Sequence, residues 1–279
     1  MLRPPPAPAV SALPFLLVAS DLDGTLLDRH HAIDALTVDT LRRLDALGVR
    51  LVLATGRHAL DVGPLRARLG VPAHLITANG ARVFDRDDRL LARHDIDPVL
   101  ARELMQPSLS PRILLSAYLD DEWLIERPFP PLLASHRESG FRYRVADLAR
   151  HDGHGISKIL YMGGYGRLLK LEALLRARHG DSIALTFSAR HCLEVMAQGV
   201  SKGQALAALL DGMGIAPGHC IAFGDGQNDI EMLRVVGHPQ LMANAQPRLQ
   251  QALPGAARAR SNADSGVARR LRELFGLDG

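Results

Sequence analysis

The sequence predicts an α/β protein with a three-layer core, built on a parallel sheet, and a smaller α/β module inserted into that core. Two observations predict this arrangement. Short apolar runs alternate with stretches of helical periodicity, which is typical of buried parallel strands connected by helices. A pattern of hairpins interrupts the alternation in the middle of the chain and indicates the insertion. A chain of 279 residues is long enough to form both parts.

Composition excludes several classes of protein. The hydrophobic fraction is 47%, and no apolar run approaches the length of a membrane helix. The 33 basic and 30 acidic residues leave a net charge of +3, and the arginines are scattered, so we expect neither a nucleic-acid nor a membrane partner. Cys192 and Cys220 lack metal-ligand spacing and are expected to be buried. Residues 1–14 are rich in Pro and Ala and lack a signal-peptide pattern, which predicts a disordered tail and a cytoplasmic protein.

The first predicted strand, residues 15–20, is followed along the chain by Asp21 and Asp23 and then by Gly24 and Thr25. Ligands of parallel sheets bind outside the carboxyl ends of the strands, where these carboxylates would lie. Two such carboxylates repel each other unless a divalent cation neutralises them or one of them holds a proton. A magnesium site shared with a substrate phosphate fits best, and a surface turn rich in Asp is the alternative.

A helix over residues 37–47, with Asp34 or Thr37 as its cap, connects this strand to a second one at residues 50–54. A right-handed crossover then brings Thr55 to the same sheet edge as Asp21. A hydroxyl at this place could bind a phosphoryl oxygen, or it could simply end the strand.

The next helical stretch, residues 58–69, contains Gly63-Pro64, which should break or restart the helix. A third strand over residues 73–77 turns at Asn79-Gly80 into a short strand over residues 82–84.

From residue 85 the pattern changes to that of the inserted module. A helix start at Asp97-Pro98, a hairpin of residues 112–119 and 122–126, and a helix ending at Gly140 are predicted in turn. A strand over 156–162, a helix over 167–179 and a strand over 183–187 complete the module. We therefore expect a core of residues 15–84 and 193–279, with a cap of residues 85–192.

The parallel pattern resumes with a helix over 202–213, which Lys202 opens. A core strand over 219–223 ends in Gly224-Asp225-Gly226-Gln227-Asn228-Asp229, and a helix over 230–236 and a last strand over 240–242 follow. A lysine at a helix start, such as Lys202, is by itself expected to be a solvated surface residue. Asp229 could merely cap the helix predicted over residues 230–236.

These segments together resemble the haloacid dehalogenase superfamily of phosphohydrolases, whose core is a Rossmann-like fold. The superfamily's four motifs are matched in order by Asp21 to Thr25, by Thr55, by Lys202 and by Gly224 to Asp229. The position of the insertion resembles the Cof-like branch, which carries a large α/β (C2-type) cap between the second and third motifs.

The resemblance implies a site with divided roles. Mg²⁺ would be held by Asp21, by Asp225 and by the main-chain oxygen of Asp23. Asp21 would attack phosphorus to give an aspartyl-phosphate, and Asp23 would transfer the proton. The residues expected to bind the phosphoryl group are Thr55, Gly56, Lys202 and Asn228. Asn228 and Asp229 would also hold Lys202 and the waters of the metal in place.

The implied activity is hydrolysis of a small phosphorylated metabolite. The stretches 55–60, 139–143 and 192–195 are similar to the hydroxymethylpyrimidine pyrophosphate (HMP-PP) phosphatases of that branch, which act in thiamine-related metabolism, and pyridoxal phosphate or sugar phosphates would be further substrates. A sugar phosphomutase is the enzymatic alternative. A nucleotide-binding regulator is the non-enzymatic one, although the first strand–helix turn lacks the G-x-G-x-x-G pattern. Trp123 could belong to the core of the cap or to a substrate pocket.

Overall fold

The computed structural model describes residues 13–109, 111–137 and 139–277 of the chain. The predicted disordered tail, residues 1–14, therefore lies almost wholly outside the described residues. Within the described part, no helix has the length and apolar character needed to cross a membrane.

The core is an eight-stranded sheet in the order β14-β13-β12-β1-β2-β3-β4-β5. All pairs from β14 to β3 are parallel, and β4 and β5 add an antiparallel edge. β1 lies in the middle, and its four residues are all buried, as expected of a strand covered on both faces. The strands are β1 (Leu17–Ser20), β2 (Arg50–Ala54), β3 (Ala73–Thr77), β4 (Arg82–Phe84), β5 (Leu90–Arg93), β12 (Cys220–Gly224), β13 (His238–Met242) and β14 (Ala257–Ala259).

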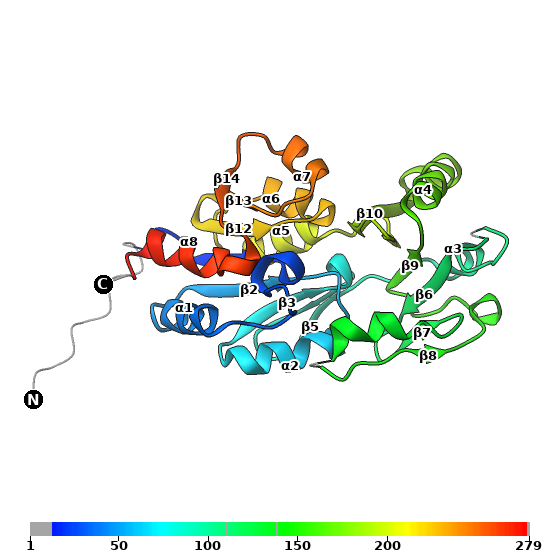
Figure 1. Ribbon diagram of the computed structural model, residues 1–279, viewed down its shortest axis with the longest axis horizontal. Coiled ribbons are helices and arrows are strands. Elements are labelled where there is room, and N and C mark those ends of the chain that lie inside the picture. The colour runs from blue at the N-terminus through cyan, green and yellow to red at the C-terminus, as the bar shows by residue number, and fades with distance from the viewer. Residues whose placement is uncertain (1–12, 110, 138, 278–279) are drawn as a thin grey trace, which may run out of the picture.

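Helices cover both faces of this sheet and give the predicted three layers (Figure 1). One apolar cluster joins the sheet to α1 (Ala35–Ala46), α2 (Ala59–Leu69) and α8 (Gly266–Phe275). A second cluster, on the opposite face, joins it to α5 (Lys202–Gly212), α6 (Ile230–Arg234) and α7 (Pro247–Ala252).

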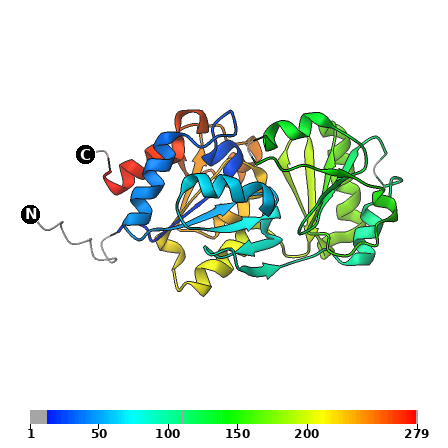
Figure 2. The same cartoon turned by 90° about the horizontal axis from the view of Figure 1, so that it is seen from below.

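A second sheet, of six strands in the order β10-β11-β9-β6-β7-β8, forms a separate lobe beside the core (Figure 2). Its pairs are antiparallel except for β7 and β8. The outer face packs on α3 (Pro98–Leu104) and α4 (Tyr165–His179), and the inner face packs against residues of the core. The strands are β6 (Leu114–Tyr118), β7 (Trp123–Ile125), β8 (Arg144–Val145), β9 (Lys158–Met162), β10 (Ile183–Ala189) and β11 (Cys192–Ala197).

Strand membership differs by several residues from the boundaries expected at 84/85 and 192/193. β5 pairs with β4 in the core sheet, although residues 90–93 were assigned to the cap. β11 belongs to the second sheet, although residues 193–197 were assigned to the core. We propose that the six-stranded sheet, which we call the cap, is delimited by β6 and β11.

Two local expectations were wrong. Gly63-Pro64 does not break the helix, because α2 runs through Pro64 to Leu69. Burial of Val62, Leu65 and Leu69 against the sheet outweighs the hydrogen bond that Pro64 removes. The segment before Gly140 forms only a short 3₁₀ helix, Pro130–His136. Two other expectations are confirmed: Asp34 is the N-terminal capping residue of helix α1, and Cys192 and Cys220 are buried.

Candidate active site

The site begins where three adjacent strands end. β1 pairs in parallel with β2 on one side and with β12 on the other. Asp21, Thr55 and Asp225 directly follow these three strands, so the topology brings them to one edge of the sheet.

Lys202 connects two of the predicted aspartates. Its Nζ lies 2.6 Å from Oδ1 of Asp21 and 2.6 Å from Oδ1 of Asp229. The lysine side chain is fully buried at the first turn of α5, whose cap is Ser201. Burial opposes the charged form, but Asp21 and Asp229 outweigh it and raise the pKa of Lys202. Lys202 is therefore a buried cation and not a solvated surface residue.

Asp229 organises the loop after β12. Its Oδ2 accepts hydrogen bonds from the main-chain N–H groups of Asp225 (3.0 Å) and Gly226 (2.9 Å), while Oδ1 faces Lys202. This side chain is 0% exposed, and a fully buried carboxylate needs such partners. Asp229 thus contacts Lys202, the residue it was expected to hold, and also fixes the main chain at Asp225, which was not anticipated.

The side chain of Asp225 packs against Gly24 and Thr25, in the turn that follows β1. Its Oδ1 accepts a hydrogen bond from Oγ1 of Thr25 at 3.2 Å. Gly24 has a φ of +78°, and a Cβ at this position would collide with the carboxylate of Asp225. Only glycine allows this close approach without strain.

The carboxylates of Asp21, Asp225 and Asp229 form a cluster that fits a divalent cation. One oxygen of each lies within 4.8 Å of the other two. Burial raises the pKa of Asp21 well above its usual range despite Lys202. Burial, followed by the charge of Asp229, raises the pKa of Asp225 to about 7. A single lysine thus leaves the cluster short of positive charge, and oxygen donors of this kind are those that Mg²⁺ prefers.

The side chain of Asp23 lies apart from this cluster. Its Oδ2 and Oδ1 accept hydrogen bonds from Nε and Nη2 of Arg57, both at 2.6 Å, and His31 Nδ1 lies 2.9 Å from Oδ1. Burial opposes ionisation, but the contacts with Arg57 and His31 outweigh it and hold the pKa of Asp23 well below its usual range. Asp23 is therefore a paired carboxylate in this arrangement.

Thr55, Gly56 and Asn228 line the space next to the cluster. The Thr55 hydroxyl accepts a hydrogen bond from the main-chain N–H of Arg57 at 3.0 Å. Asn228 donates to Oδ1 of Asn79 at 3.1 Å. Of the two residues expected to hold Lys202, Asp229 contacts its ammonium group, whereas the side chain of Asn228 donates its hydrogen bond to Asn79.

The cap contributes a buried ion pair that the sequence analysis missed. Lys158 Nζ lies 2.8 Å from Oε1 of Glu194 and also donates to the carbonyl of Gly56 in the core. Asn79 donates to the other oxygen of Glu194. A lysine and a glutamate inside otherwise apolar strands were the available signal, because buried charges are rarely found without a partner.

A cavity of about 260 Å³ lies between the two sheets and is open to the carboxylates. From the core it is lined by Asp21, Asp225 and neighbouring residues. From the cap it is lined by apolar and aromatic side chains and also by polar or charged ones, namely His136, Lys158, Ser188, His191 and Glu194. Trp123 is 2% exposed, belongs to the apolar cluster of the inner cap face and also lines the cavity. It is therefore both cap core and cavity wall.

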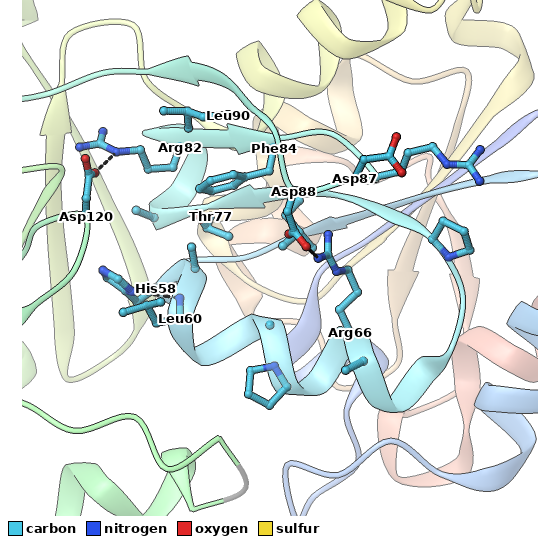
Figure 3. A pocket seen from close by; sticks show the side chains of 18 of the residues that line it. His58, Leu60, Arg66, Thr77, Arg82, Phe84, Asp87, Asp88, Leu90 and Asp120 are labelled. Carbon is cyan, nitrogen blue, oxygen red and sulfur yellow. Dashed lines mark hydrogen bonds and ion pairs between the residues drawn. The ribbon is translucent and has the colours of Figure 1, made fainter.

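A second, larger cavity, of about 940 Å³, lies between α2 and the β3–β4 edge of the core sheet (Figure 3). It holds none of the clustered carboxylates. His58 is buried at its rim, its side chain accepts a hydrogen bond from the main-chain N–H of Leu60 at the start of α2, and its Nε2 lies 2.7 Å from the carbonyl of Leu119 in the cap. The chemistry of the smaller cavity, not the size of the larger one, identifies the candidate site.

Comparison with known proteins agrees with this geometry. The family model of the haloacid dehalogenase-like hydrolases matches residues 18–271. A putative phosphatase of Haemophilus influenzae is 42% identical over 269 residues, covering 95% of this chain and 99% of the relative. An HMP-PP phosphatase of an Enterobacter species is 40% identical over 233 residues, covering 84% and 86%. A haloacid dehalogenase-like hydrolase from B. subtilis superposes with a TM-score of 0.83 at 27% identity, covering 93% and 99%.

The chain belongs to the haloacid dehalogenase-like hydrolases. Its inserted second sheet is that of the Cof-type branch, as predicted. Within this branch it is a phosphatase of small phosphorylated metabolites.

Proposed function

We propose that this phosphatase depends on Mg²⁺ and works through an aspartyl-phosphate on Asp21. The observation that carries the proposal is the convergence of Asp21 and Asp225, at the ends of the neighbouring strands β1 and β12, with Lys202 at the start of α5. Asp21, Asp225 and the main-chain oxygen of Asp23 would hold Mg²⁺, which neutralises phosphate charge and orients the phosphoryl group when it is bound.

The reaction then follows from the residues. A carboxylate oxygen of Asp21 attacks phosphorus, and the bond from phosphorus to the leaving oxygen breaks. Lys202, Thr55, Gly56 and Asn228 bind the phosphoryl oxygens, on which charge collects in the transition state. Water then attacks the aspartyl-phosphate and releases Asp21 and inorganic phosphate.

Asp23 is the residue proposed to move protons. As a carboxylate paired with Arg57, it is suited to accept a proton from the attacking water. Donation to the leaving oxygen requires that it first be protonated. A leaving group that needs little protonation, such as the phosphate oxygen of a diphosphate ester, therefore suits this arrangement best.

We propose HMP-PP, hydrolysed to HMP-P and phosphate, as the preferred substrate. Its phosphate leaving group fits the state of Asp23, the aromatic inner face of the cap fits a flat ring, and a 40% identical relative carries that name. Pyridoxal phosphate and sugar phosphates would be additional substrates, and a cytoplasmic role in thiamine-related metabolism remains part of the proposal.

One screen tests the proposal. The purified protein is incubated with HMP-PP, pyridoxal phosphate and a panel of sugar phosphates, with Mg²⁺ and with EDTA, and released phosphate is measured. Mg²⁺-dependent release with the highest kcat/KM for HMP-PP is expected. A higher kcat/KM for a monoester would overturn the substrate, and full activity in EDTA would overturn the metal.

A further inference from the structure

A buried carboxylate outside the metal cluster connects the core to the cap. Asp61 lies on α2 and is 0% exposed. It contacts Nη1 of Arg57 at 3.0 Å and Nδ1 of His136 at 2.9 Å, and it accepts a hydrogen bond from the hydroxyl of Ser139. His136 and Ser139 belong to the segment between β7 and β8 of the cap.

Arg57 continues this connection to the site. Its Nη1 faces Asp61, whereas Nε and Nη2 face Asp23, so all three guanidinium nitrogens make hydrogen bonds. The planar guanidinium fixes the direction of these bonds, which a lysine could not do. A continuous series of charged contacts therefore runs from the cap segment through Asp61 and Arg57 to Asp23.

The burial of Asp61 makes the series sensitive to the position of the cap. A buried carboxylate is costly unless its partners are in place. Two of the three partners of Asp61, His136 and Ser139, belong to the cap segment. When they are absent, Asp61 gains access to water and holds Arg57 less firmly, and the carboxylate of Asp23 loses its fixed position.

We propose that Asp61 is a positioning residue that transmits the docking of the cap segment, through Arg57, to the carboxylate of Asp23. Proton transfer at Asp23 is then set up only when the cap covers the substrate, so the steps that need Asp23, above all activation of the water that hydrolyses the aspartyl-phosphate, do not proceed in an open site. The inference rests on the proposed function, in which Asp23 moves the proton.

The test is a double-variant cycle on Asp61→Asn and Asp23→Asn, with phenyl phosphate and nitrophenyl phosphate as substrates. Asn keeps the size of the side chain and removes its charge. Asp61→Asn is expected to lower kcat on the order of 10-fold with little change in KM, and to rank the two substrates in the same order as Asp23→Asn does. The double variant is expected to be no slower than Asp23→Asn alone, since both changes act on one function.

Asp120→Asn is the matched control. Asp120 lies in the cap turn between β6 and β7 and pairs with Arg82 of the core (Figure 3). It also pairs with Arg93 of the core, and neither arginine contacts Asp23. It removes a charged core–cap contact without touching the series through Arg57. We expect it to change kcat by the same small factor for both substrates, and to add its effect to that of Asp23→Asn.

Additive losses in the double variant, or a control that reproduces the coupling, would overturn the proposal. Melting temperatures show whether Asp61→Asn folds. If it does not, Ser139→Ala removes only one cap contact, and its smaller loss must show the same coupling to Asp23→Asn. Absence of phosphate release by the unmodified protein from every substrate would instead refute the proposed function.

Discussion

Lys202 and Asp21 form a buried ion pair, with Nζ 2.6 Å from Oδ1, although they are 181 residues apart in the sequence. Lys202 has a second charged partner, because Oδ1 of Asp229 lies 2.6 Å from the same ammonium group. Because two aspartates share one lysine, replacing Asp21 and replacing Lys202 should affect stability differently.

Asp21→Asn should abolish turnover while the fold survives. The change removes the proposed nucleophile, so phosphate release should fall on the order of 10⁴-fold or more. Lys202 keeps Asp229 as its charged partner, and the crowding of carboxylates is relieved, so the melting temperature should not fall.

Lys202→Met is the contrasting variant. It leaves Asp21 and Asp229 buried without their cation, which costs about 3–5 kcal/mol for a broken buried pair. Thermal melting beside phosphate release distinguishes the two variants. Equal destabilisation by both would contradict the shared ion pair.

Mg²⁺ should stabilise the protein as well as activate it. A ligand that binds only the folded state adds about 2.7 kcal/mol at 100 times its dissociation constant, so the melting temperature should rise on addition of Mg²⁺ and fall in EDTA. Asp225→Asn removes one proposed ligand and should abolish most of this rise. A rise of the same size in Asp225→Asn would argue that the ion binds elsewhere.

Gly24→Ala should damage the carboxylate cluster specifically. The new Cβ would collide with Asp225, so the turn at Gly24 or the loop that carries Asp225 must shift. The rise in melting temperature on addition of Mg²⁺ should therefore shrink, and the rate of phosphate release should fall on the order of 10-fold or more.

Gly48→Ala is its matched control. Gly48 has a similar φ of +85°, but nothing lies within 4 Å of a Cβ placed there. Both variants carry the same backbone strain, of about 1 kcal/mol, and only Gly24→Ala should lose Mg²⁺ binding. Loss of binding in both would indicate a general destabilisation.

The sequence predicted which strand-end residues come together, because strand ends can be read from the apolar pattern. Asp21, Thr55 and Asp225 each come directly after an apolar run, and parallel pairing alone brings such positions together. Lys202 was placed by the resemblance to the family, since a lysine at a helix start carries no signal of burial.

The contacts between core and cap could not be predicted. Asp61 and His136 are 75 residues apart, and only the docking of two sheets brings them together. The ion pair of Asp23 with Arg57 depends on side-chain direction, which a motif does not specify. For the same reason the sequence left the role of Trp123 open.

Trp123→Ala is expected to reduce stability and substrate binding together, because Trp123 is both cap core and cavity wall. The ring stacks on Phe141 with centroids 5.9 Å apart, and its Nε1 donates to the hydroxyl of Ser116 at 2.8 Å. Truncation of so large a buried side chain costs about 3–5 kcal/mol. Melting temperature would report this loss, and KM should rise for every substrate.

Trp123→Phe separates the two roles of this ring. It keeps an aromatic face and most of the packing, and it loses the hydrogen bond to Ser116, worth about 1 kcal/mol. We expect a small fall in melting temperature and a KM that rises more for pyrimidine and pyridoxal esters than for acetyl phosphate, because only flat rings use the larger indole face. Ser116→Ala, which removes the same hydrogen bond but keeps the indole, should match the fall in melting temperature and leave KM unchanged. If KM rose equally for acetyl phosphate in Trp123→Phe, the indole would support the cap fold without contacting the substrate ring.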